Sequence, residues 1–120
     1  MPNLSLVILY VDNPTASAAF YADLLGQSPA EASPTFAMFK LASGVGIGLW
    51  SRHTVEPAAA AAGGGAELAF TAEDVDAVHA HWARRGLSIA QPPTDMDFGR
   101  SFVALDPDGH RLRVFAPAER

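Results

Sequence analysis

The side chains able to do chemistry in this sequence are few, and they are spread along its 120 residues. There is no cysteine, so thiolate nucleophiles, disulfides and cysteine-ligated metals are excluded. Of the four histidines, His79 and His81 lie two apart in a predicted helix and point in different directions. His53 and His110 lie beside predicted turns. Because a metal-binding histidine needs partners at matched positions, we expect surface or capping roles for all four.

The composition narrows the possible partners and the compartment. The net charge is −5, the pI is about 5.1, and Lys40 is the single lysine, which argues against binding to a nucleic-acid backbone. No apolar run approaches the roughly 20 residues that span a bilayer, and the N-terminal segment lacks the features of a signal peptide. The lack of cysteine is typical of a reducing compartment. We therefore expect a cytoplasmic protein that binds neither nucleic acid nor membrane.

The elements that must position the chemical groups occur twice in the same order. An apolar segment at 6–9 leads into a helical pattern at 14–26, and a second at 67–70 leads into another at 75–86. Asn13 before Pro14, and Asp74 before Val75, are typical helix-starting residues. Apolar residues at helical spacing predict one buried face on each helix. These residues are Ala16, Ala19, Phe20 and Leu24 in the first helix, and Val75, Val78 and Trp82 in the second.

After each helix the apolar period falls to two, which predicts a hairpin, and a weaker extended segment precedes each hairpin. The hairpin strands are 36–41 with 45–50 and 102–105 with 110–115, and the weaker segments are 27–32 and 87–91. The Ala/Gly-rich stretch 57–66 predicts a linker. The sequence thus predicts an α+β fold with two βαβββ modules, at 1–56 and 67–120, in one structural domain.

Two phrases, LYVDNPTASAAFYADLLG and FVALDPDGHRLRVFAP, give the chain a resemblance to the vicinal oxygen chelate superfamily, which includes glyoxalase I, extradiol dioxygenases and bleomycin-resistance proteins. The resemblance spans nearly the whole chain. It implies that the two modules form a curved mixed sheet around a cleft. Metal-dependent members place ligands on the first and last strands of each module. The matching positions here are Leu6, Gly48, Glu67 and Arg113.

These four positions do not make a metal site. Leucine and glycine have no side-chain donor atom, and Arg113 is a permanent cation that would repel a divalent ion. Glu67 alone falls short of the three protein ligands that catalytic zinc requires. We therefore expect a protein without a metal and without another cofactor.

Strand alternation divides each strand into a face that meets the helix and a face that meets the predicted cleft. Glycine and alanine predict a roomy floor, and aromatic residues line its edges. The residues predicted on this face are Leu6, Ile8, Tyr10, Phe36, Met38, Gly46, Gly48, Trp50, Glu67, Ala69, Thr71, Arg111, Arg113 and Phe115.

Residues 91–100 are interpreted as a loop whose Met96 and Phe98 close over a flat ligand. Polar residues of the same segment, Asp95, Asp97 and Arg100, could orient it. The predicted ligand-binding residues are Tyr10, Phe36, Met38, Gly48, Trp50, Glu67, Met96, Phe98 and Arg113. Each has a structural alternative: Trp50 could fill the core or a dimer contact, Met96 and Phe98 could anchor the loop, and Glu67 with Arg113 could be a structural ion pair.

The resemblance implies a protein that sequesters a small planar aromatic compound, similar to the metal-free bleomycin-, mitomycin- and phenazine-resistance branch. We expect the compound to be an antibiotic, so that the protein confers resistance or carries a metabolite, and we expect binding in preference to catalysis. The alternatives are an enzyme of the glyoxalase or dioxygenase type, or a metal-free enzyme that uses Glu67 as a general base. We also expect a homodimer, because a chain this short has few other ways to bury a large apolar surface.

Overall fold

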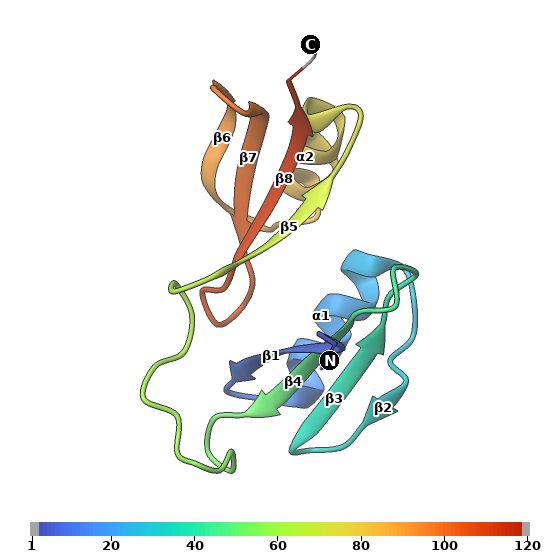
Figure 1. Cartoon of the computed structure of the whole chain (residues 1–120), viewed down its shortest axis with the longest axis vertical. Helices are drawn as coiled ribbons and strands as arrows, with labels where there is room; N and C mark the ends of the chain where they lie inside the picture. Colours follow the sequence, from blue (N-terminus) through green and yellow to red (C-terminus); the bar gives the residue numbers. More distant parts are fainter. Residues whose placement is uncertain (1–2, 119–120) are drawn as a thin grey trace. The chain divides into compact units, whose positions relative to one another are not determined.

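The order β-α-β-β-β occurs twice along the chain, as predicted (Figure 1). The computed structural model describes residues 3–118, and it divides between Gly63 and Gly64 into two compact units, unit 1 and unit 2. Unit 1 contains β1 (Leu6–Val11), α1 (Pro14–Leu25), β2 (Glu31–Ala32), β3 (Phe36–Lys40) and β4 (Gly46–Ser51). Unit 2 contains β5 (Glu67–Thr71), α2 (Val75–Arg84), β6 (Ser88–Met96), β7 (Gly99–Leu105) and β8 (Arg111–Pro117).

Each unit forms a four-stranded mixed sheet with the same topology. The strand orders are β1-β4-β3-β2 and β5-β8-β7-β6. In both sheets the first strand pairs in parallel with the last, and the other pairs are antiparallel. Helix α1 covers one face of the first sheet and α2 covers one face of the second (Figure 1). The other face of each sheet is therefore free to carry a site within its own unit.

Helix α1 begins and ends at the predicted residues, but it buries a different face. The Asn13 side chain accepts a hydrogen bond from the Ala16 N–H at 3.2 Å, and Gly26 ends the helix with a φ of 67°. The predicted stripe of Ala16, Ala19, Phe20 and Leu24 is wrong. The buried residues are Pro14, Ser17, Ala18 and Tyr21. Hydrophobicity alone misses this face because Ser17 is polar yet small enough to lie against the sheet.

Helix α2 packs as predicted. Its Asp74 side chain accepts a hydrogen bond from the Ala77 N–H at 3.0 Å, and Val75 and Trp82 are buried. The Trp82 ring makes an edge contact with Phe102 at a centroid distance of 5.4 Å. Trp82 is thus a core residue of unit 2. Neither helix among residues 3–118 is long and apolar enough to cross a bilayer.

The segment 91–100, predicted as a loop, forms the tip of a hairpin made by β6 and β7. Residues up to Met96 belong to β6, β7 begins at Gly99, and only two residues connect them. The consecutive prolines Pro92 and Pro93 suggested a loop because proline cannot donate to a strand ladder. They are tolerated here because β6 is the edge strand and its register shifts near them.

Candidate functional site

The face of unit 1 that points away from α1 carries a row of aromatic side chains. Trp50 on β4 is in register with Tyr10 on β1 and with Phe36 on β3. The Phe36 and Trp50 rings meet edge to face, with centroids 6.2 Å apart. All three residues are half-buried, whereas Leu9 and Leu49, which point to the helix, are buried. The predicted alternation of β1 and β4 is therefore confirmed.

The floor of this face is not open, contrary to the prediction. A Cβ at Gly48 would lie 3.2 Å from two atoms of the Phe36 ring and 3.3 Å from Ile8 Cγ1. A Cβ at Gly46 would lie 3.0 Å from Leu6 Cδ1. The glycines thus let neighbouring side chains lie flat on the sheet, instead of leaving space for a ligand. Met38 on β3 is also in register with Gly48 and is half-buried.

The corresponding face of unit 2 is built around an ion pair between Glu67 on β5 and Arg113 on β8. Arg113 Nε donates to Glu67 Oε1 at 2.7 Å, and Arg113 Nη2 donates to Glu67 Oε2 at 2.9 Å. This bidentate arrangement matches the planar guanidinium to the carboxylate. The exposed fractions of the two side chains are 18% for Arg113 and 30% for Glu67, so solvent screens the pair only in part.

Further contacts hold the Arg113 guanidinium in place. Its Nη1 donates to Ser101 Oγ at 2.9 Å and lies 4.0 Å from Met96 Sδ. The Arg113 Cζ atom lies 6.0 Å from the centre of the Phe98 ring, which also meets Phe115 edge to face. The structure thus brings the four predicted residues of this unit, Glu67, Met96, Phe98 and Arg113, together on one face. Met96 and Phe98 come from the β6–β7 hairpin instead of a loop.

Glu67 is a poor general base in this environment. The pKa of Glu67 lies below its ordinary value, mainly because Arg113 donates hydrogen bonds to the carboxylate. Burial alone would raise this pKa, but its effect is smaller. The same contacts raise the pKa of Arg113. An effective general base needs a pKa near the working pH and a lone pair aimed at the substrate. Glu67 instead directs both carboxylate oxygens to Arg113.

The positions at which the family resemblance places metal ligands do not fit a metal. The Leu6 side chain covers Gly46, Gly48 lies beneath Phe36, and both oxygens of Glu67 accept hydrogen bonds from Arg113. Two histidines have other contacts: His53 Nε2 lies 2.7 Å from Asp12 Oδ1, and the His79 ring meets the Phe102 ring edge to face. Within residues 3–118 there is no group of three or more His, Asp or Glu side chains that could hold a metal ion.

Three residues that reach or line the Arg113 cluster were not predicted as ligand contacts: Gln91, Ser101 and Arg111. Arg111 was placed on the correct face by alternation but was given no role. Ser101 could have been found by extending the alternation of β7 back from Val103. Gln91 could not, because the register of β6 shifts on both sides of it.

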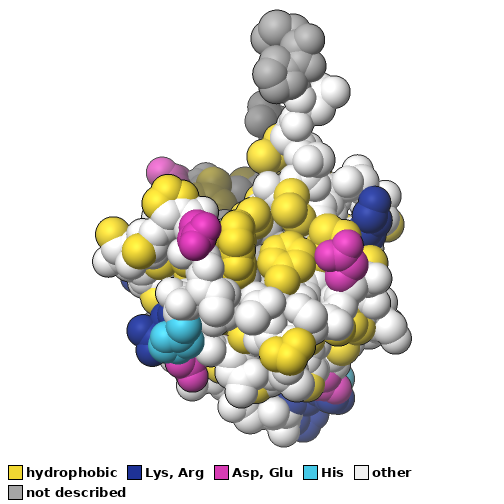
Figure 2. Space-filling view, turned by 90° about the horizontal axis from the view of Figure 1, so that it is seen from below, with side chains coloured by type: hydrophobic (Ala, Val, Ile, Leu, Met, Phe, Trp, Pro, Cys, Tyr) yellow, Lys and Arg dark blue, Asp and Glu magenta, His cyan; other side chains and the backbone are white. Residues whose placement is uncertain are grey.

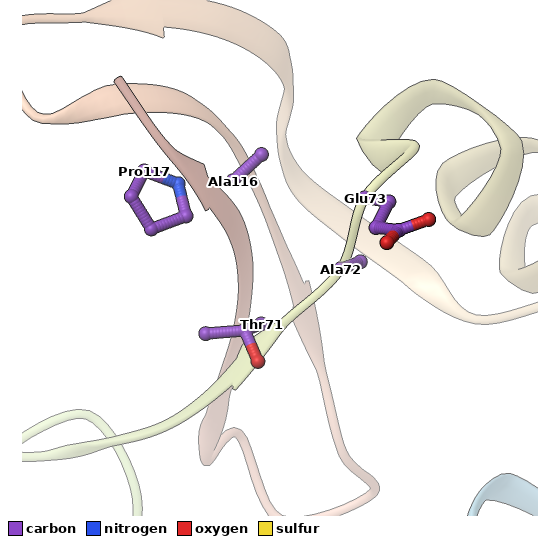
Figure 3. Close-up of a pocket in the computed structure, with 5 residues that line it drawn as sticks. All are labelled: Thr71, Ala72, Glu73, Ala116 and Pro117. Carbon is purple, nitrogen blue, oxygen red and sulfur yellow. The ribbon is translucent and has the colours of Figure 1, made fainter. Parts of the chain in front are cut away.

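The rest of the surface offers weaker candidates. On the face shown in Figure 2, the basic side chains lie apart from one another, so they do not form a positively charged patch there. A hollow of about 560 Å³ lies at the ends of β5 and β8. Figure 3 shows its lining residues, which are Thr71, Ala72, Glu73, Ala116 and Pro117. A single carboxylate among small side chains has little with which to orient a ligand.

Two βαβββ units, each with one sheet face behind a helix and the other lined by the predicted residues, define a two-module α+β protein of the glyoxalase fold class. A model of the Glyoxalase/Bleomycin resistance protein/Dioxygenase superfamily matches residues 3–114. The chain therefore belongs to this superfamily, and the resemblance seen in the sequence is confirmed.

Several known proteins are similar to this chain. The phenazine antibiotic resistance protein EhpR of Enterobacter agglomerans is 33% identical over 120 residues, which cover 94% of this chain and 89% of EhpR. A protein of Agrobacterium tumefaciens, solved in solution by NMR, is 54% identical, with a TM-score of 0.90 and coverage of 99% of this chain and 100% of that one. TnmS3, an antibiotic binding protein from Streptomyces sp. CB03234, is 20% identical with a TM-score of 0.76, covers 98% of each chain, and shares the fold.

Proposed function

We propose that this protein binds and sequesters a small planar aromatic compound of the phenazine type in the cytoplasm, without a metal and without catalysis. The observation that carries the proposal is the half-buried row of Tyr10, Trp50 and Phe36 on the face of unit 1 away from α1. A flat ring that stacks on such side chains gains about 1 kcal/mol per contact beyond the burial of its area. The similarity to EhpR supports the phenazine class and a role in resistance.

The contacts of unit 2 favour binding over catalysis. An enzyme of the glyoxalase type needs a metal to polarise its substrate, and the residues at the ligand positions are unsuited to hold one. A metal-free enzyme would need a free base, whereas the Glu67 carboxylate is engaged by Arg113. A binding protein needs neither group.

The central experiment is a calorimetric titration of the full chain with phenazine. Replacing Trp50 with alanine should weaken binding by about 2 kcal/mol, or roughly thirtyfold, because it removes the middle ring of the aromatic row. The matched control is Trp82→Phe, which changes the buried tryptophan of the core and should leave affinity within about twofold. No binding of phenazine by the wild type, or equal affinity for the Trp50→Ala variant, would overturn the proposal.

Elemental analysis tests the metal-independent part separately. Protein purified without chelators should contain well below one equivalent of zinc, nickel, iron or manganese, and phenazine affinity should be unchanged after dialysis against EDTA. A stoichiometric transition metal whose removal abolishes binding or turnover would favour the glyoxalase-type enzyme instead.

The homodimer is also a proposal. Several large apolar side chains are exposed in the single chain, with exposed fractions of 76% for Leu4, 40% for Ile8 and 42% for Phe98. Isolated chains rarely leave several such groups in water, and a symmetric dimer is the commonest way to cover them. Light scattering should give twice the mass of the chain, and a monomer mass at all accessible concentrations would contradict the proposal.

A further inference from the structure

The sheet face of unit 1 that carries the aromatic row also carries a carboxylate, that of Glu31 on β2. Glu31 is directly opposite Met38 on β3, and the side chains of directly opposite residues lie on the same face of a sheet. The next residue, Ala32, is opposite the buried Ala37, and both line a hollow beside Ala18 of α1. Because successive strand residues alternate between faces, Glu31 points to the face away from α1.

Glu31 lies close to the aromatic row. Phe36 precedes Met38 by two residues on β3, so Glu31 and Phe36 are diagonal neighbours on the same face. Residues in this relation are about 7–8 Å apart, within reach of a long side chain. Glu31 is exposed, and within residues 3–118 no ion pair or side-chain hydrogen bond engages its carboxylate. A flat ligand stacked on Phe36 would therefore have this carboxylate at its edge.

The other charges at the ends of β1, β3 and β4 are distant or paired. Lys40 lies on the same face as Phe36, but it is four residues further along β3. This separation is about 13 Å, which exceeds the screening length of about 8 Å at physiological salt. Asp12 Oδ1 accepts a hydrogen bond from Arg52 Nη2 at 3.3 Å and lies 2.7 Å from His53 Nε2. The carboxylate on β2 therefore sets the sign of the charge beside the row.

The rings of the row favour a ligand charge of the opposite sign to this carboxylate. The face of an aromatic ring is negative, and tryptophan attracts a cation more strongly than tyrosine or phenylalanine does. Trp50 is in register with Tyr10 on one side and with Phe36 on the other. A neutral flat molecule gains only from stacking, whereas a flat cation gains from the ring faces and from the carboxylate as well.

We infer that the aromatic face of unit 1 prefers flat ligands that carry a positive charge, and that Glu31 is a specificity-determining residue for this charge. The inference rests on the proposed function and narrows the class of ligand to planar aromatic cations, such as N-alkylated phenazinium ions. All of the groups involved belong to unit 1. The positive nitrogen of the ligand is expected at the edge nearest to β2, where the carboxylate lies.

The test compares phenazine with N-methylphenazinium, which has the same flat ring system and one positive charge, by calorimetry of the full chain in the dark. Wild-type protein should bind the cation about tenfold more tightly, as contact with an aromatic face beside a carboxylate predicts. In Glu31→Gln this preference should fall to about threefold, because the carboxylate charge is lost while the rings remain. Affinity for phenazine should not change, and added salt should reduce the wild-type preference toward that of the variant.

Lys40→Gln is the matched control, because it removes the other exposed charge from the strands of the same sheet face. It should keep the tenfold preference within about twofold, since Lys40 is far from the row. Equal wild-type affinities for the two compounds, or an unchanged preference in Glu31→Gln, would overturn the inference while phenazine binding leaves the proposed function intact. A change in Lys40→Gln as large as that in Glu31→Gln would overturn it as well. Failure of phenazine to bind would instead overturn the proposed function.

Discussion

Unit 1 and unit 2 share their order of elements, their sheet topology and their way of packing a helix, yet the faces opposite the helices are chemically different. The third residue of the last strand in unit 1 is Gly48, which lies beneath the Phe36 ring. The third residue of the last strand in unit 2 is Arg113, which is fixed by Glu67 and Ser101. One face is therefore apolar and aromatic, and the other is ionic.

This difference shows how one fold can carry two kinds of surface. Successive strand residues alternate between the two faces, so Ile47 and Leu49 can build the core while Gly48 and Trp50 vary independently of it. The same holds for Leu112 and Val114 against Arg113 and Phe115 in unit 2. Substitutions on each face should thus have separable effects on stability and on binding.

The largest expected effect comes from Gly99, at the start of β7, because unit 2 depends on its β6–β7 hairpin. Gly99 has a φ of 138°, and a Cβ there would overlap the carbonyl oxygen of Ala116. Gly99→Ala should lower the free energy of unfolding by about 3 kcal/mol, measured in urea. Gly44→Ala in the turn of unit 1, where φ is 95° and no heavy atom is near, should cost about 1 kcal/mol. Equal losses would contradict the role of the close contact.

The second-largest expected effect comes from substitution of Arg113, which removes the ion pair of unit 2. Arg113→Met leaves the Glu67 carboxylate, whose side chain is 30% exposed, without two strong donors, and the free energy of unfolding should fall by about 2 kcal/mol. The double variant Glu67→Gln with Arg113→Met should recover part of this loss, because the acid that lost its two donors is removed as well. A double variant less stable than the sum of the single changes would show that the pair is not the source of the effect.

The corresponding change in unit 1 should affect binding more than stability. Gly48→Ala places a methyl group 3.2 Å from the Phe36 ring, which must shift by a few tenths of an ångström. Phenazine affinity should fall about fivefold, or about 1 kcal/mol, because Phe36 belongs to the aromatic row. Gly65→Ala, where no heavy atom lies within 4 Å, is the control and should bind as the wild type does. Unchanged affinity in Gly48→Ala would separate Phe36 from the ligand.

The smallest expected effect is a pH dependence of stability that belongs to unit 2. Hydrogen bonds from Arg113 lower the pKa of Glu67 in the folded protein below its ordinary value of 4.5. The stabilisation is therefore fully present above pH 4.5 and is lost as the pH falls through the lowered pKa. The measurement is the free energy of unfolding of the wild type and of Glu67→Gln at several pH values. The difference between the two proteins should become smaller as the pH falls below 4.5, by up to about 1 kcal/mol. A difference that does not change with pH would contradict the pairing.

Local rules were sufficient for most of the fold. Asn13 and Asp74 could be recognised as helix caps, because capping involves atoms only three residues apart in the sequence. The faces of β1, β4 and β8 followed from the two-residue period of a strand. The buried face of α1 could not be predicted in this way, because Ser17 is not recognisable as a core residue until the sheet lies against it.

The sequence by itself determined the repeated order of elements, the helix ends, the position of Trp50 and Arg113 on the sheet faces opposite the helices, and the unsuitability of Leu6 and Gly48 as metal ligands. The tertiary structure alone decided that Phe36 covers Gly48 and that Arg113 takes both oxygens of Glu67, a residue 46 positions away in the chain. The physical reason is range. Backbone sterics and capping act over a few residues, whereas contacts between side chains on different strands depend on register and rotamer, which are set when the sheet assembles.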